Sequence, residues 1–321
     1  MKTIRLPGIS FPVSQFCLGC AYLGSREDEK TSFEILDTYY DAGGRFLNTA
    51  HEYGYGKSET TIGKWIRERG IRDEVIVTSK IGEDHTKPKS CAMHAEELFE
   101  DIDETLSRTG FDYLDFCMLH LDDPSVPVAE IMGAMNEIRL QGKIRYYGCS
   151  NWSIERQREA AAWADAHGCP HFALDEIEMS LSRLNYTNAE RGIKWMDGDY
   201  IAYHRETGMP VAAYSPICNG LLTKYLRDGD VRAWSEWQIK SHLNDANLET
   251  ARRLGKVAAE TGCTPTQVQI AWQLAQPYGF VSFPIVGART VAQLQDSLSG
   301  IDCTLTPEMI EYLTPKEESL R

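Results

Sequence analysis

The chain has 321 residues, of which 42% are hydrophobic and 25% are charged, and its formal net charge is −14. These fractions are typical of a globular protein, and the acidic balance disfavours nucleic acid and anionic membrane surfaces as partners. No apolar run approaches the ~18–20 residues of a membrane-spanning helix, and the first residues lack a signal peptide's apolar core. We therefore expect a cytoplasmic protein with no membrane partner.

Nine cysteines are scattered singly through apolar stretches, a distribution that is typical of a reducing compartment. Cys17 and Cys20 form the one close pair, and neither a second pair nor a histidine cluster accompanies them. We predict no metal site, because no group of His, Asp and Glu has the sequence spacing of metal ligands.

The chain begins with a short segment, residues 1–13, in which Pro7, Gly8 and Pro12 indicate a small hairpin that caps the core. Apolar runs of strand length then alternate with amphipathic segments. The predicted strands are Gln15–Cys20, Phe46–Ala50, Val75–Lys80, Tyr113–His120, Ile144–Ser150, Phe172–Glu178, Pro210–Ser215 and Val281–Val286. The predicted helices are 29–43, 57–69, 91–109, 127–141, 153–167, 189–207, 246–262 and 290–299.

Eight strand–helix units with nearly continuous apolar strands predict a parallel sheet covered by helices. Eight such units that close on themselves form a (β/α)8 TIM barrel, here a single domain over residues 1–321. A doubly wound sheet is the alternative fold. That fold favours a Gly-x-Gly-x-x-Gly turn after the first strand, and residues 18–24 do not contain one.

Two connections are longer than a strand–helix loop requires. Residues 81–90 follow the third predicted strand, and residues 216–245 follow the seventh. Long loops in compact domains are commonly functional. Both follow the carboxyl end of a strand, so we expect both to overhang the same mouth of the barrel.

Titratable side chains stand at or just after the carboxyl ends of three strands. Tyr53 follows the second strand, Lys80 ends the third and His120 ends the fourth. Strand ends of this kind meet at one rim of a barrel, so the three should converge. A phenol beside an ammonium and an imidazole can transfer a proton, because the nearby cation favours the tyrosinate. No serine or thiol stands beside an evident base, which disfavours a nucleophilic hydrolase.

Several motifs occur in the order found in one known family. They are Asn48-Thr-Ala-x-x-Tyr-Gly54 with Gly56-x-Ser-Glu59, Val77-Thr-Ser-Lys80, Tyr113-Leu-Asp-Phe-x-x-Leu-His120, Gly142-Lys-Ile-Arg-x-x-Gly-x-Ser-Asn151, Ala213-Tyr-Ser-Pro216 with Gly220-Leu-Leu-Thr-Lys224, and Pro284-Ile-Val-Gly287. Over nearly its whole length the chain resembles the aldo-keto reductases, which are NAD(P)(H)-dependent oxidoreductases on a (β/α)8 barrel. The resemblance implies that Tyr53 is the general acid/base, Lys80 lowers its pKa and His120 orients the substrate carbonyl.

The resemblance also implies a nicotinamide cofactor, NAD or NADP. The implied cofactor residues are Ala21, Tyr22, Ser150, Asn151, Glu176, Tyr214, Ser215, Gly220, Leu222, Gly287, Arg289, Gln293 and Asp296. The family's Arg, Glu and Asn contacts near the adenosine appear here as Gln293, Asp296 and Ser297. Losing an arginine there weakens the case for a 2′-phosphate contact, so we favour NAD.

Two departures from the family pattern concern charge. Asn48 stands where the family has the Asp of its catalytic tetrad, and Glu176, or Glu178 in an alternative register, stands where it usually has a Gln that holds the carboxamide. If Lys80 is charged, losing the aspartate makes the site more positive by about one unit and favours the tyrosinate further. If Lys80 is neutral, Tyr53 loses its activator. A carboxylate at position 176 would favour the oxidised, cationic nicotinamide.

These features predict an oxidoreductase that acts on a small carbonyl or alcohol substrate, and they favour oxidation of an alcohol such as a sugar or polyol over reduction of an aldehyde. The substrate side chains that we expect at the mouth are His51, Trp152, Trp234 and Trp237. Two alternatives stay open. One is an epimerase or lyase that uses tightly bound NAD transiently, and the other is a nicotinamide-binding regulatory subunit with weak turnover. The sequence does not indicate an oligomeric state.

Overall fold

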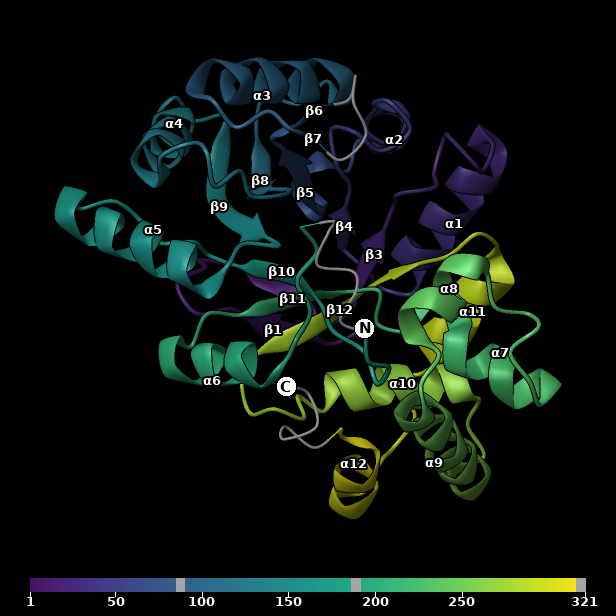
Figure 1. Cartoon of the computed structure of the whole chain (residues 1–321). Coiled ribbons are helices and arrows are strands. Elements are labelled where there is room, and N and C mark those ends of the chain that lie inside the picture. Colours follow the sequence, from purple (N-terminus) through teal and green to yellow (C-terminus); the bar gives the residue numbers. More distant parts are fainter. Residues whose placement is uncertain (85–89, 186–191, 316–321) are drawn as a thin grey trace. The chain divides into compact units, whose positions relative to one another are not determined.

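The computed structural model describes residues 1–84, 90–185 and 192–315 (Figure 1). This part of the chain divides into two compact units. The first comprises Met1–Glu176 with Gly287–Val291, and the second comprises Ile177–Val286 with the residues from Ala292 onwards. The prediction of one domain over the whole chain stays a prediction.

The eight predicted strands are all present. They are β3 (Cys17–Gly19), β4 (Phe46–Asn48), β5 (Ile76–Ile81), β8 (Leu114–Leu119), β9 (Ile144–Ser150), β10 (Asp175–Glu178), β11 (Val211–Tyr214) and β12 (Ser282–Gly287). Their order is β3-β4-β5-β8-β9-β10-β11-β12, and they close into a barrel. The (β/α)8 prediction is therefore confirmed over the alternative doubly wound sheet.

In the first unit, neighbouring strands from β3 to β9 pair in parallel and follow one another in sequence. All six residues of β8 are buried, as expected for a strand covered on both faces. The helices of this unit are α1 (Glu29–Asp41), α2 (Lys57–Arg69), α3 (Ala95–Thr109), α4 (Val128–Leu140) and α5 (Ile154–His167). Each packs against the next along the chain, and in Figure 1 they run from purple to teal.

Local sequence explains where these helices begin and end. Ser153 caps α5 by accepting a hydrogen bond from the backbone N–H of Arg156. His94 and Glu97 form a capping box at the start of α3. Gly110 ends α3 in the left-handed conformation, with φ of +70°, which glycine adopts without strain.

Two small antiparallel pairs accompany the first unit. The predicted N-terminal hairpin is confirmed by β1 (Thr3–Arg5), which pairs with β2 (Pro12–Ser14). β6 (Glu83–Asp84) pairs with β7 (Ser90–Cys91) at the two ends of the predicted loop after the third strand. The centre of that loop, residues 85–89, lies outside the described residues.

The second unit contains helices that the sequence pattern indicated and helices that it did not. The indicated ones are α6 (Gly198–Thr207), α9 (Asp245–Thr261) and α11 (Val291–Ser299). The additional ones are α7 (Leu221–Asp228), α8 (Glu236–His242), α10 (Pro265–Leu274) and α12 (Pro307–Leu313). The long predicted loop after β11 is therefore largely helical. The first residues of the predicted helix 189–207 lie outside the described range.

None of the described helices combines the length and the apolar character needed to cross a membrane.

Candidate active site

Polar side chains stand at the carboxyl ends of adjacent strands in the first unit. The parallel register aligns Asn48 of β4 with Thr78 of β5, and Lys80 of β5 with Met118 of β8. The carboxyl ends of β4, β5 and β8 therefore lie beside one another, and His120 follows the last of them. The expected convergence of side chains from these strand ends follows from this register.

Lys80 is the centre of the constellation, and its side chain is only 1% exposed. Its ammonium donates to Asn48 Oδ1 at 2.7 Å, to the Thr49 carbonyl at 3.0 Å and to Tyr53 Oη at 3.1 Å. Its Nζ also lies 3.2 Å from Glu176 Oε1. Burial alone would lower the pKa of Lys80, but the negative charge of Glu176 and the interaction with Tyr53 outweigh it and raise that pKa. Lys80 is therefore charged.

Glu176 changes the charge of the site from the one that we expected. Its second oxygen, Oε2, accepts a hydrogen bond of 2.8 Å from Asn48 Nδ2. The carboxylate thus replaces the charge that is lost at position 48, and the expectation of a more positive site is wrong. Both oxygens of Glu176 already have partners in the site, an arrangement that we did not predict for a residue expected at the carboxamide.

Tyr53 also departs from expectation. Burial raises its pKa above the ordinary value of 10.0, Lys80 opposes that rise and Glu176 adds to it. The net direction is upwards, so the prediction that the site favours the tyrosinate is wrong. At neutral pH the phenol keeps its proton, and it can therefore act as an acid.

His120 lies next to Tyr53, and its orientation is held by a carboxylate. The two rings meet edge to face, with centroids 5.6 Å apart. His120 Nδ1 lies 2.8 Å from Glu83 Oε2, so Nδ1–H can donate to that oxygen. The sequence analysis did not identify Glu83, because it belongs to the short strand β6 inside a predicted loop.

The remaining cofactor candidates of the first unit lie at the ends of its strands and in a flanking turn. Asn151 has a φ of +62°, and its Nδ2 donates to Ser150 Oγ at 2.9 Å and to the His120 carbonyl at 3.3 Å. Arg289 is 57% exposed and forms a 2.7 Å ion pair with Glu27. The residues that are partly or fully exposed are Ala21, Tyr22 and Gly287.

The cofactor candidates of the second unit surround the start of α7. Ser215, Cys218 and Asn219 have positive φ, as does Gly220, which caps α7 without any side-chain hydrogen bond. The backbone N–H groups of Cys218 and Gly220 donate to the Ser215 and Ile217 carbonyls, both at 2.8 Å, so an anion here would have to bind the N–H groups of the first turn of α7. Tyr214 ends β11, half-buried, and its hydroxyl donates to the Lys194 carbonyl at 3.4 Å. Leu222 is buried in the first turn of α7.

Asp296, also in the second unit, is bound at the start of α10. Thr264 Oγ1 and Gln267 Nε2 both donate to Asp296 Oδ1, at 2.8 Å and 2.9 Å. These two residues also form the capping box of α10. Gln293 is exposed on α11.

Three of the four expected substrate residues are buried side chains. His51 is 1% exposed and lies beside Asp101 and Glu104 of α3. The indole N–H groups of Trp152 and Trp234 donate to backbone carbonyls within the core, those of Leu121 and Leu221. In this structure these three offer no surface to a substrate, because tertiary packing uses them.

Trp237 is the half-buried member of the expected substrate set. Its ring meets His242 edge to face, with centroids 5.2 Å apart. Its indole Nε1 has no hydrogen-bond partner among the described residues.

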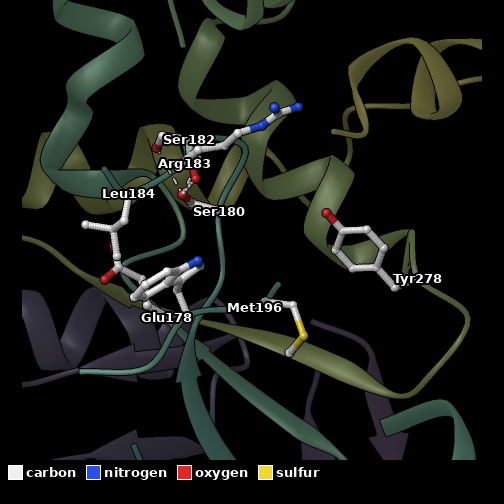
Figure 2. Close-up of a pocket in the computed structure, with 8 residues that line it drawn as sticks. Glu178, Ser180, Ser182, Arg183, Leu184, Met196 and Tyr278 are labelled. Carbon is white, nitrogen blue, oxygen red and sulfur yellow. Dashed lines mark hydrogen bonds between the residues drawn. The ribbon is translucent and has the colours of Figure 1, made fainter. Parts of the chain in front are cut away.

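A pocket in the second unit was not evident from the sequence. It is lined by polar, aromatic and apolar side chains from the end of β10, the segment after it and the segment after α10 (Figure 2). Glu178, Ser180 and Arg183 lie on one segment, and Tyr278 faces them from another. Burial lowers the pKa of Arg183.

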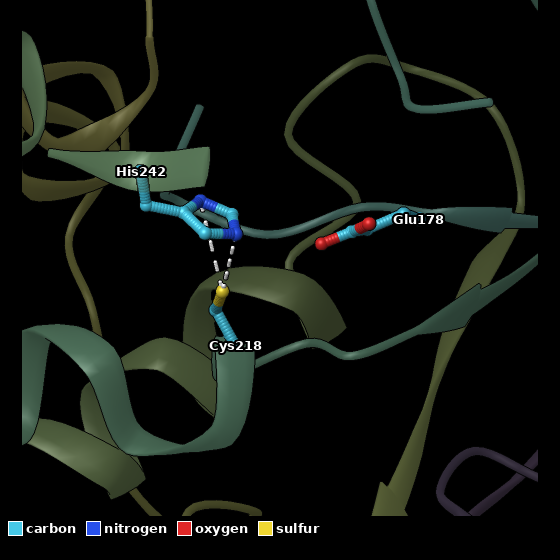
Figure 3. Close-up of side chains that lie close together, drawn as sticks. All are labelled: Glu178, Cys218 and His242. Atoms are coloured by element: carbon cyan, nitrogen blue, oxygen red, sulfur yellow. Dashed lines mark hydrogen bonds between the residues drawn. The ribbon is translucent and has the colours of Figure 1, made fainter. Parts of the chain in front are cut away.

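A second group that the sequence did not reveal consists of Glu178, Cys218 and His242 (Figure 3). All three are buried, and their donor atoms lie within 4.8 Å of one another. These are atom types that could hold a metal ion. Cys218 Sγ lies 3.2 Å from His242 Nε2, and the His242 Nδ1 lies 3.2 Å from the Arg183 carbonyl. If the Cys218 thiol donates to the neutral imidazole of His242, this hydrogen bond satisfies both groups without a metal ion.

Burial is the largest influence on the ionisation of each member of that group. It raises the pKa of Glu178 to about 7 and that of Cys218 to about 12, and it lowers that of His242 to about 4. A thiol and an imidazole are therefore neutral at neutral pH, next to a carboxyl near its midpoint.

Comparison with known proteins finds relatives that match nearly the whole chain. The model of the aldo/keto reductase family matches residues 15–318. A putative voltage-gated potassium channel subunit beta of Schizosaccharomyces pombe is 28% identical, over 94% of this chain and 89% of the relative. The aryl-alcohol dehydrogenase [NADP(+)] of Phanerodontia chrysosporium is 28% identical, over 96% and 83%. The aldo-keto reductase str7 of Strobilurus tenacellus is also 28% identical, over 90% and 82%.

The family match, the closed eight-stranded barrel and the ordered motifs agree with one another. The chain therefore belongs to the aldo/keto reductase family.

Proposed function

We propose that this protein is a nicotinamide-dependent reductase that converts a small aldehyde or ketone into an alcohol, with Tyr53 as the general acid. The observation that carries the proposal is the 3.1 Å hydrogen bond between a protonated phenol and the buried ammonium of Lys80. A phenol so placed can give its proton to a carbonyl oxygen, and the adjacent cation stabilises the phenolate that remains.

Each residue of the site has a distinct part in this proposal. The substrate oxygen accepts a hydrogen bond from Tyr53 Oη, and the proton moves along it. His120, whose Nδ1 contacts Glu83, orients the substrate carbonyl relative to Tyr53. The cofactor, when bound, supplies the hydride that reduces the carbonyl carbon. In the reverse direction, the Tyr53 phenolate accepts the hydroxyl proton of an alcohol while the oxidised cofactor accepts the hydride.

In the second unit, the start of α7 is the candidate pyrophosphate site, because no side chain caps this helix. The backbone N–H groups of Cys218 and Gly220 already donate to the Ser215 and Ile217 carbonyls, so the proposal assigns the pyrophosphate to the N–H groups of the first turn of α7. The family pattern gives Tyr214 the role of stacking on the nicotinamide. It gives Ser150 and Asn151 the role of holding the carboxamide. These residue roles are part of the proposal.

We propose NAD or NADP as the cofactor. The lean towards NAD finds no support, because a relative that matches most of the chain is named for NADP(+). Arg289 is the candidate partner for a 2′-phosphate, and it would have to exchange its ion pair with Glu27 for that contact.

Aromatic aldehydes are the first substrate class to test, since this relative is named an aryl-alcohol dehydrogenase. Sugars and polyols form the second class. The structure weakens the reason for choosing them, because three of the four aromatic and imidazole groups assigned to a carbohydrate surface are buried.

The test is to follow oxidation of NADPH and NADH by an aryl aldehyde, with an aldose in parallel, for the parent and Tyr53→Phe. We expect turnover by the parent and a loss of about 100-fold or more in the variant, because a phenylalanine cannot donate a proton. Equal rates for both proteins would overturn the role of Tyr53. Nucleotide that co-purifies with the protein, without net cofactor turnover, would favour the transient use of NAD in an epimerase or lyase.

A further inference from the structure

We propose that Glu176 of β10 is the counter-ion that keeps Lys80 charged and positioned, in place of a carboxylate on β4. The inference rests on the proposed function and assigns Glu176 as a positioning residue, since it acts on Tyr53 through Lys80.

The contacts of Lys80 carry this assignment. In the described part of the chain, Lys80 forms one ion pair, with Glu176 Oε1 at 3.2 Å. Both side chains are almost completely buried, with exposed fractions of 1% and 4%. The other groups that Lys80 touches are an amide oxygen, a backbone carbonyl and a phenol, which carry no full charge when Tyr53 is protonated.

Asn48 connects the two charged groups. Its Oδ1 accepts from Lys80 and its Nδ2 donates to Glu176 Oε2, so a single amide completes a closed ring of three side chains. An aspartate at position 48 could accept from Lys80 but could not donate to Glu176. The amide is therefore the side chain that this position requires when the carboxylate stands at position 176.

The exchange leaves the net charge of the site unchanged. An Asp at position 48 with a Gln at position 176 would carry one negative charge, as Asn48 with Glu176 does. The carboxylate has moved from one side of the ammonium to the other. A buried ammonium without any carboxylate would tend to lose its proton and with it the ability to stabilise the phenolate.

The test compares four forms of the full-length protein: the parent, Glu176→Gln, the exchanged double variant Asn48→Asp with Glu176→Gln, and Asp175→Asn. Asp175 is a matched control, because it is a fully buried carboxylate on the same strand whose oxygens accept from Gln157 Nε2 and from the Cys149 thiol. The readouts are kcat and KM for carbonyl reduction across pH, and the thermal midpoint. The charged groups that act on Tyr53 and must be considered in the pH profile are Lys80, Glu176 and Glu52, with His120 beside the ring.

We expect Glu176→Gln to lower kcat about 100-fold with little change in KM, and to lower the thermal midpoint. The double variant should recover kcat to within about tenfold of the parent and regain its midpoint, whereas Asp175→Asn should keep the parental kcat. The proposal is overturned if Glu176→Gln keeps the parental kcat and pH profile, or if the double variant is no better than Glu176→Gln in either readout.

The thermal midpoints separate this inference from the proposed function. If the parent reduces no carbonyl, the proposed function fails. The thermal midpoints of the variants then still show whether Glu176 is the counter-ion of Lys80. The counter-ion role is supported if Glu176→Gln has a lower thermal midpoint than the parent and the exchanged double variant returns to the parental value. No recovery contradicts it.

Discussion

The pKa of a buried phenol beside an ammonium and a carboxylate depends on three effects: burial and the carboxylate raise it, and the ammonium lowers it. For Tyr53 burial is the largest, and Glu176 offsets part of the help that Lys80 gives. The phenol is thus the resting form, which suits a proton donor in carbonyl reduction.

The pH dependence of the two directions follows from this state. Reduction requires the protonated phenol, which persists below a pKa that lies above 10.0, so the reduction rate should stay level from about pH 6 to about pH 9. Oxidation requires the phenolate and should rise throughout that range. Initial rates in both directions check this. A reduction rate that halves near neutral pH would contradict it.

Glu178 provides a test of stability at the same scale. Its pKa is raised from 4.5 to about 7 by burial, so its contribution to stability is present below about pH 4.5 and is lost as the pH rises through 7. Glu178→Gln removes this loss, and we expect it to stabilise the protein by about 3 kcal/mol near pH 8. Denaturant unfolding near pH 8 and near pH 5 measures the difference, which should shrink at the lower pH.

The matched control for this experiment is Glu34→Gln, because the side chain of Glu34 is 55% exposed. It should change the free energy of unfolding by no more than about 0.5 kcal/mol at either pH. If Glu178→Gln changes the free energy of unfolding as little as Glu34→Gln does, burial does not raise the pKa of the Glu178 carboxyl.

Residue by residue, the sequence predicted which side chains lie near one another at the strand ends better than it predicted their contacts. Tyr53, Lys80 and His120 were found because strand ends of a parallel fold converge whatever the details of packing. The pairing of Glu176 with Lys80 was missed, because it depends on which atoms meet across the fold between residues far apart in the chain. The group of Cys218 and His242 was missed for the same reason.

At the scale of elements, two helical glycines have opposite surroundings. A Cβ on Gly63 of α2 would overlap the backbone of Thr109 at the end of α3, whereas a Cβ on Gly133 of α4 would meet nothing within 4 Å. Gly63 is therefore the residue that lets α2 and α3 approach closely.

Alanine at these two positions should shift stability in opposite directions. Gly63→Ala forces α2 and α3 apart and should cost about 1–3 kcal/mol. Gly133→Ala improves helix propensity without a clash and should add up to about 1 kcal/mol. Thermal and denaturant unfolding of both variants checks this. A stabilising Gly63→Ala would show that the two helices are not in close contact.

Strands were easier to predict than helices, and the reason is physical. Strands of a parallel sheet are buried on both faces, so they appear as apolar runs, and Ile144–Ser150 agrees with β9 at both ends. Helix α10 was missed although Thr264, Pro265 and Gln267 form a capping box with proline in the first turn. Helices α7 and α8 lie within a stretch without a long amphipathic repeat, and packing determines them.

At the scale of the whole molecule, family membership explains the arrangement of strands, and it leads to a prediction about binding. Any ligand that binds only the folded chain raises its stability by mass action, by about 2.7 kcal/mol when its concentration is 100 times the Kd. We expect NADP(H) or NAD(H) to raise the thermal midpoint, and an equal concentration of ATP to do less. The larger of the two shifts identifies the preferred cofactor. No shift with either dinucleotide would argue against a nicotinamide site.

The most direct measurement traces the hydride itself. The parent protein is given an aryl aldehyde and reduced nicotinamide cofactor that carries deuterium at the transferred position, and the alcohol product is analysed by mass spectrometry. We expect one deuterium on the former carbonyl carbon, and the Tyr53→Phe variant should form little of this product. An alcohol without deuterium, or no alcohol with any carbonyl tested, would contradict hydride transfer at this site.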